Sequence, residues 1–145
     1  MNLESYLYQN IPLSKAMGIK IHHESADKVI LFAPFANNIN HKKTVFGGSL
    51  HAAATLACWC LLYLNVHDPS LQIVITKSEI DYLAPVDSDF TVECLMPEKS
   101  IWERFMQMLQ SKGKARILLA AKIMHNDKLA VDYQGVFAVL KQCPA

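Results

Sequence analysis

The pattern of hydrophobic and polar residues contains one long apolar stretch. Val45 to Val66 contains no Lys, Arg, Asp or Glu. This pattern predicts a helix from about Ser49 to Asn65, with Ser49 or Gly48 as its N-cap residue, and Asp68-Pro69 ends the segment. A helix that is apolar on every side is typical of one that other parts of the protein surround.

Segments typical of β-strands lie on both sides of this helix. Before it, Ile19–His23 and Lys28–Pro34 have the β-branched and apolar content of a hairpin around the turn Ser25-Ala26-Asp27. After it, the sequence predicts four further strands, at Leu71–Leu83, Phe90–Met96, Ala115–His125 and Leu129–Leu140. The turn Asn126-Asp127-Lys128 joins the last two strands into a second hairpin.

Shorter elements account for the rest of the chain. Leu3–Met17 has the periodicity of a helix, with a break at Ile11-Pro12. The polar segment Phe35–Thr44 is rich in asparagine and predicts a loop. Ile101–Gln110 predicts a short helix, with Ser100 as the N-cap residue of a capping box.

Together these elements predict an α+β protein that forms a single domain over residues 1–145. A domain of this length is ordinary. Strands that form a meander after one apolar helix imply an antiparallel sheet packed against that helix. Because the helix has no face suited to water, the sheet has to curve around it. A curved antiparallel sheet wrapped around one long apolar helix is the hotdog fold.

The composition argues against several classes of protein. Apolar residues make up 52% of the chain, which disfavours intrinsic disorder. The net charge is +1 with both signs dispersed, so we expect no nucleic-acid partner. The apolar stretch is long enough to cross a membrane. However, a glycine pair, His51 and Thr55 interrupt it, and the strands need a helix to cover, so we expect no membrane span.

The N-terminus and the cysteines predict a cytoplasmic protein. Residues 1–5 have neither the basic nor the apolar region of a signal peptide. The four cysteines, Cys58, Cys60, Cys94 and Cys143, lack the spacing of a zinc site, and we expect them to be reduced, with buried thiols. The isolated histidines His22, His23, His41, His67 and His125 show no metal-ligand spacing either, so we expect no metal site.

Two segments of the chain resemble a known family. The stretch Asn40-His41-Lys42-Lys43-Thr44-Val45-Phe46-Gly47-Gly48-Ser49-Leu50 is similar to the junction between loop and helix in hotdog thioesterases. The stretch Ile80-Asp81-Tyr82-Leu83-Ala84-Pro85-Val86 is similar to the strand that follows the helix in that fold. More narrowly, Thr44 to Ser49 resembles the putative thioesterase domain at the C-terminus of YiiD-type proteins. The resemblance covers nearly the whole chain and implies the same fold.

The resemblance also shows where this chain departs from the commoner thioesterase pattern. In that pattern a His precedes the glycine pair, and a carboxylate follows one or two turns into the helix. Phe46 and Thr55 occupy these positions here. The resemblance therefore implies a thioester site at the helix start, with substrate-binding positions at Phe46, Gly47, Ser49 and Asp81, but it removes both of the usual catalytic groups.

The glycine pair gives a physical reason to expect thioester chemistry at the helix start. Glycine lets another group approach the backbone closely, and the free N–H groups of the first helical turn favour negative charge. A thioester carbonyl that is attacked by water develops such a charge on its oxygen. The N–H groups of Gly48 and Ser49 are therefore candidates for an oxyanion hole. The alternative is that the glycines only permit close packing of the helix.

Four polar residues near the helix start are candidates for the chemistry. His51 and Thr55 share one helix face, and a neutral His can act as a general base. Thr55 and Asn40 are candidates to orient a water molecule. Alternatively, His51 is a core or interface histidine, Thr55 bonds its own backbone, and Ser49 only caps the helix. Asp81 lies on a strand face typical of contact with solvent and is a weaker candidate for the base.

The resemblance implies hydrolysis of an acyl-CoA or acyl-carrier-protein thioester. CoA or phosphopantetheine would then be part of the substrate, with no separate cofactor. The resemblance also implies a homodimer and leaves a tetramer open. Because both usual catalytic groups are replaced, a second hypothesis is a non-catalytic module that binds acyl thioesters or regulates through them. A dehydratase of hydroxyacyl thioesters is disfavoured, because the helix contains no carboxylate.

Overall fold

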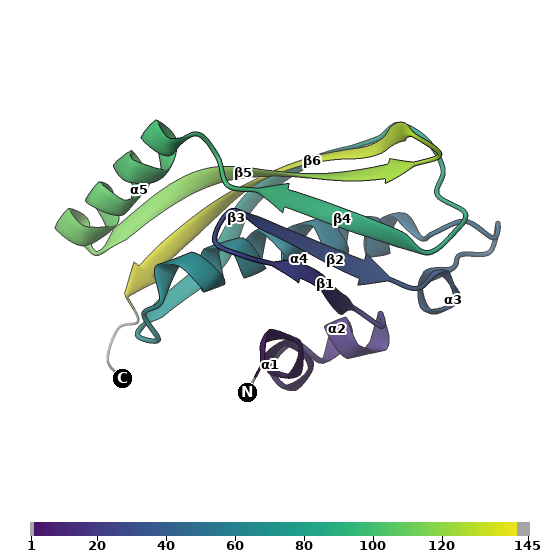
Figure 1. Cartoon of the computed structure of the whole chain (residues 1–145), viewed down its shortest axis with the longest axis horizontal. Helices are drawn as coiled ribbons and strands as arrows, with labels where there is room; N and C mark the ends of the chain where they lie inside the picture. The colour runs from purple at the N-terminus through teal and green to yellow at the C-terminus, as the bar shows by residue number, and fades with distance from the viewer. Residues whose placement is uncertain (1, 142–145) are drawn as a thin grey trace.

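The structure is a computed structural model that describes residues 2–141, and one six-stranded antiparallel sheet forms its centre (Figure 1). The strands are β1 Lys20–Glu24, β2 Lys28–Ala33, β3 Leu71–Tyr82, β4 Phe90–Leu95, β5 Lys114–His125 and β6 Lys128–Lys141. The helices are α1 Leu3–Asn10, α2 Pro12–Ala16, α3 Phe35–Asn38, α4 Gly47–Val66 and α5 Lys99–Lys112. All six predicted strands are present, with ends that differ from the predicted ones by a few residues.

The order of the strands in the sheet is β1-β2-β4-β5-β6-β3. The antiparallel pairing is as predicted, and both hairpins form. The predicted meander is wrong, because β3 lies beside β6 and not beside β4. The cause is the path of α4, which crosses the face of the sheet after β2, so that β3 forms at the opposite edge of the sheet. Strand β4 then returns to pair with β2.

Helix α4 lies against one face of the sheet, and α1 and α2 lie on the same side (Figure 1). Side chains along its length are fully buried, among them Ala53, Ala57 and Leu61. The inner strand β5 alternates buried and exposed residues, as expected for a sheet with one face on the core. Among the described helices, α4 alone is long and apolar enough to span a membrane. Its contacts with the sheet make it the core helix of the fold.

The start of α4 differs from the prediction. The helix begins at Gly47, and its N-cap residue is Phe46 rather than Ser49 or Gly48. No side chain caps it; instead, the Phe46 carbonyl accepts the N–H groups of Ser49 and Leu50 at 2.9 and 3.2 Å. The predicted N-cap is therefore wrong, because a backbone carbonyl performs the function that was assigned to a hydroxyl.

Two other local predictions are wrong. The segment predicted as a loop contains the short helix α3, which the side-chain amide of Asn38 stabilises by donating to the carbonyls of Pro34 and Met17. Helix α5 has Glu98 as its N-cap residue, so Ser100 lies inside the helix and forms no capping box. In contrast, the predicted break at Ile11-Pro12 is confirmed, since Ile11 separates α1 from α2.

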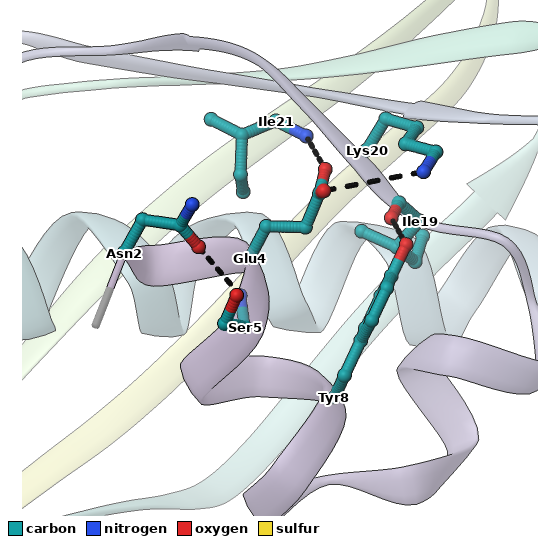
Figure 2. Close-up of polar contacts among 7 residues, drawn as sticks. All are labelled: Asn2, Glu4, Ser5, Tyr8, Ile19, Lys20 and Ile21. Atoms are coloured by element: carbon teal, nitrogen blue, oxygen red, sulfur yellow. Dashed lines mark hydrogen bonds and ion pairs between the residues drawn. The ribbon is translucent and has the colours of Figure 1, made fainter.

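Polar contacts fasten α1 to strand β1 (Figure 2). One Glu4 carboxylate oxygen accepts the backbone N–H of Ile21 at 3.1 Å, and the other lies 3.9 Å from the Lys20 ammonium group. The Tyr8 hydroxyl donates to the carbonyl of Ile19. These contacts join the helix to the edge strand of the sheet. They therefore hold α1, and with it α2, beside α4, and these two helices together form the α1–α2 wall.

The cysteines with described positions are reduced and buried, as predicted. Cys58 and Cys60 on α4 and Cys94 on β4 are free thiols. Burial raises the pKa of the Cys58 and Cys60 thiols, which keeps both in the unreactive protonated form. Cys143, the fourth cysteine, lies outside the described residues.

Candidate functional site

The start of α4 is shaped by Phe46 and by the two glycines that follow it. A Cβ atom at Gly48 would collide with the Phe46 ring, so this ring lies directly over the Gly48 backbone. A Cβ at Gly47 would meet only the Tyr82 ring, at an ordinary 3.5 Å, and the Tyr82 hydroxyl donates to the Gly47 carbonyl at 3.1 Å. The Phe46 side chain is 57% exposed. The helix start is thus accessible at Phe46 and close-packed at Gly48.

The backbone N–H groups at the helix start are not equivalent. The N–H of Ser49 is already used by the Phe46 carbonyl. Within residues 2–141, the N–H groups of Gly47 and Gly48 have no acceptor. Of the two N–H groups predicted for an oxyanion hole, only that of Gly48 is therefore free to bind one.

His51 lies one turn further along α4, between two side chains from the sheet. Its Nε2 atom forms a 2.9 Å hydrogen bond with the Ser78 hydroxyl of β3. Its ring forms a T-shaped contact with the Tyr133 ring of β6, with 5.4 Å between the ring centroids and 80° between the planes. Both contacts restrict the imidazole. His51 is therefore a partly buried base candidate with a defined orientation.

Thr55 lies one turn beyond His51 and bonds the same tyrosine. The Thr55 and Tyr133 hydroxyls are 2.8 Å apart. Tyr133 is fully buried, and burial raises the pKa of its phenol to about 12. Gly135 provides the room, because a Cβ there would lie 2.7 Å from the Tyr133 hydroxyl oxygen. The predicted alternative for Thr55, a bond to its own backbone, is not what the structure contains.

A cleft of about 480 Å³ opens beside these residues, between α4, β3 and the α1–α2 wall. This volume lies within the range of about 300–1,000 Å³ that is common for small-molecule sites. Its polar residues include His51, Thr55 and Ser78. Its apolar residues include Ile11, Leu13, Met17, Ala52, Leu56 and Ile75. A ligand with a polar reacting group and an apolar chain would match this lining.

The structure brings together only some of the predicted site residues. Gly48, His51 and Thr55 share one face of α4. His51 and Thr55 line the cleft, whereas Phe46, Gly47 and Gly48 do not. Asn40 does not line it; its side chain donates to the Thr44 hydroxyl and accepts two backbone N–H groups of the same loop. Ser49 and Asp81 are not lining residues either, and Asp81 is exposed on β3.

Two site residues were missed by sequence reasoning. Ser78 and Tyr133 contact the candidate base and the candidate hydroxyl, from strands 27 and 78 residues away along the chain. The only signal was the small residue at Gly135, two positions after a tyrosine on a strand.

Among residues 2–141, no group of three or more His, Cys, Asp or Glu side chains is arranged to hold a metal ion.

The sheet and its long central helix define a hotdog-fold protein of the thioesterase type, and solved structures have the same architecture. A protein of unknown function from Chlorobaculum tepidum TLS is 34% identical, with 97% of this chain and 93% of that chain covered and a TM-score of 0.89. A putative thioesterase from Shewanella oneidensis is 28% identical, with 95% and 94% covered and a TM-score of 0.83.

A more distant structure supports the fold alone. It is a Pseudomonas aeruginosa protein described as a probable thioesterase, 19% identical, with 97% of this chain and 95% of that chain covered and a TM-score of 0.82. The family itself follows from residues 1–141, which match the family described as "Putative thioesterase (yiiD_Cterm)". The chain belongs to this family, as the resemblance in its sequence indicated.

Proposed function

We propose that the protein hydrolyses acyl thioesters of CoA or of acyl carrier protein in the cleft beside α4. The observation that carries this proposal is the position of His51. It lies one turn along α4 from the free N–H of Gly48, and it borders a cleft with mostly apolar walls. A carbonyl-binding group, a base and an apolar chain site thus follow one another along α4. Membership of the thioesterase family supports the same reaction.

The hydrogen bond to Ser78 uses Nε2 of His51 and leaves Nδ1 as the ring nitrogen that can act as a base. If Nε2–H donates to the Ser78 hydroxyl, Nδ1 is unprotonated and can take a proton from water. The water oxygen then bonds to the thioester carbonyl carbon and the C–S bond breaks. The proton on Nδ1 passes to the departing thiolate, which leaves as a thiol while the acyl group leaves as a carboxylic acid.

The N–H of Gly48 would stabilise the negative oxygen that forms during this attack. A backbone donor at a helix start is well suited to this charge, because the helix dipole acts in the same direction. Phe46 lies directly over this backbone and would shield the carbonyl from bulk water, which strengthens the interaction. In this mechanism Thr55 and Tyr133 support His51 and do not react.

A second candidate is a binding module that does not turn the thioester over. The residues that line the cleft include no Asp or Glu, and the Thr55 hydroxyl is already bonded to Tyr133. The site therefore lacks the carboxylate that the commoner thioesterase pattern uses. Such a module would bind the same ligand at the same place.

We also propose that two copies of the protein pair through β3 in the cytoplasm. Strand β3 is 12 residues long and forms one edge of the sheet. Val74 and Ile75, near its middle, are 43% and 40% exposed. An edge strand this long with exposed apolar residues is prone to pair with another strand. Pairing with a second copy would cover it and bring two clefts close to the interface.

Thiol release from a panel of acyl-CoA and acyl-carrier-protein thioesters tests the hydrolase proposal. We expect turnover that falls at least a hundredfold in His51→Ala, as is usual on loss of a general base, and is unchanged in His22→Ala, which removes an exposed histidine of β1. Turnover that survives both His51→Ala and Thr55→Ala would exclude this site. Tight binding without turnover at every chain length would favour the binding module.

A further inference from the structure

Two hollows lie in line along the seam between α4 and β3. The first is the cleft described above. The second, of about 390 Å³, lies further along α4 beside Tyr63 and Val66 and beside Leu71 and Ile73 of β3. Of the described residues, only Trp59 lines both hollows. The indole of Trp59 is therefore the partition between them.

Aromatic stacking holds this partition in place. The Trp59 ring stacks on Tyr63, with 5.0 Å between centroids and 14° between planes, and on Tyr6 of α1 at 6.1 Å and 15°. Tyr6 and Tyr63 also stack on each other at 4.9 Å. Because α1 is fastened to β1 by Glu4, the stack is tied to the sheet as well as to α4. Trp59 is thus a fixed wall rather than a freely rotating side chain.

The distance from the reacting end of the cleft to this wall limits the length of a bound chain. His51 and Trp59 are eight residues apart on one helix, which corresponds to about 12 Å. An extended acyl chain of about ten carbons has that length, because each tetrahedral C–C bond of about 1.5 Å advances the chain by only about 1.25 Å. Beyond Trp59, the second hollow continues for about seven residues of α4, or roughly a further 10 Å.

We propose that Trp59 determines which acyl thioesters the protein accepts, by ending the acyl site about ten carbons from the thioester carbonyl. This inference rests on the proposed function, since it requires the carbonyl to lie near Gly48 and His51. The apolar walls of the first hollow bind the methylene groups of a medium-length chain. Longer chains meet the indole and have to bend out of the cleft. Removing the indole joins the two hollows and extends the site.

The affinity for non-hydrolysable S-alkyl-CoA thioethers of 4 to 18 carbons, measured by titration calorimetry on the full chain, tests this proposal. Affinity should rise about fourfold per added methylene up to about ten carbons and then level off or fall. In Trp59→Ala the rise should continue to chains about eight carbons longer, because the second hollow adds roughly 10 Å. Trp102→Ala, which removes a partly buried Trp of α5 outside both hollows, should keep the wild-type profile.

A second variant covers the case in which Trp59→Ala does not fold. Ala52 lines the first hollow only, so Ala52→Met should fill it and shorten the preferred chain by a few carbons. An unchanged length profile in both folded variants, or the same shift in Trp102→Ala, would overturn the assignment of Trp59.

Thiol release from acyl-CoA esters of the same lengths separates this inference from the proposed reaction. Hydrolysis with an unaltered length profile in Trp59→Ala would leave the thioesterase proposal intact and refute the function of Trp59. A shifted binding profile without any hydrolysis would support Trp59 and refute the reaction. If the thioethers do not bind and the esters are not cleaved, both proposals are wrong.

Discussion

The position of the Tyr133 side chain depends on Gly135, the residue without a side chain two positions further along β6. Only a glycine at position 135 leaves room for the phenol hydroxyl, which then reaches Thr55 across the interior. The same ring also contacts the His51 imidazole in a T-shaped arrangement. One buried tyrosine therefore holds two site residues of α4 against the sheet.

The raised pKa of Tyr133 predicts a specific loss of stability at high pH. The phenol titrates near 10 in the unfolded chain and at about 12 in the folded one. The folded state thus keeps a proton that the unfolded state loses. The contribution of Tyr133 to stability is complete below pH 10 and decreases as the pH rises towards 12. Chemical denaturation at pH 8 to 12 should show a decrease on the order of 2 kcal/mol from this residue.

Comparison with two variants isolates this effect from other groups that titrate in the same range. Tyr133→Phe should lose about 1 kcal/mol at pH 8, because the Thr55 hydroxyl loses its partner, but should then depend less on pH than the wild type. Tyr63→Phe, at a partly exposed ring, should follow the wild-type curve. Parallel curves for the wild type and Tyr133→Phe would show that the phenol does not control the alkaline loss.

At the scale of elements, the start of α4 combines a backbone cap, an exposed ring and a glycine beneath that ring. The variant Gly48→Ala tests this arrangement, and Gly47→Ala at the neighbouring position is its control. At position 48 a methyl group would push the Phe46 ring aside, whereas at position 47 it would meet Tyr82 at an ordinary distance. Because Phe46 is largely exposed, its ring can swing into solvent, so neither variant should unfold the protein.

The two alanine variants should differ in function rather than in stability. Alanine favours a helix over glycine by up to about 1 kcal/mol, so melting temperatures should stay level or rise. Gly48→Ala should lower turnover at least tenfold by moving Phe46 from the carbonyl site, and Gly47→Ala should retain it. Equal turnover in the two variants would mean that the position of the Phe46 ring is irrelevant to the reaction.

The elements also show which features the sequence determines locally. The periodicity of strands and helices, the Asn126-Asp127 turn and the break at Ile11 were all predicted, because each depends on neighbouring residues. Asn126 and Asp127 indeed both have positive φ, at 51° and 63°. The cap at Phe46 was missed, because a backbone carbonyl leaves no signature in the sequence.

The site could be predicted only in part for a related reason. Gly48, His51 and Thr55 share a helix face, which follows from their spacing alone. Ser78 and Tyr133 reach that face from remote strands, and their positions depend on the strand order. The order in turn depends on the path of α4 across the sheet. A prediction that places β3 beside β4 cannot bring Tyr133 of β6 and Ser78 of β3 to the same helix.

At the scale of the whole molecule, the free edge of β3 determines the proposed assembly. Val74→Lys places a charge on this edge, and lysine on an edge strand opposes further pairing. Light scattering after size-exclusion chromatography should show a dimer for the wild type and a monomer for the variant. The matched control is Leu118→Lys, at an apolar residue of the inner strand β5 that is 51% exposed. It should remain at least dimeric, and a monomer in that variant would place the interface elsewhere.

The late partner of β3 has a consequence for biosynthesis. Strand β3 is translated directly after α4, but its neighbour in the sheet is β6, whose residues follow some fifty to seventy positions later. Until the ribosome has released that segment, the most apolar helix of the chain is covered on one side only. The nascent protein therefore exposes its core during roughly the second half of its synthesis, when chaperones would bind it and a slowed ribosome would favour aggregation.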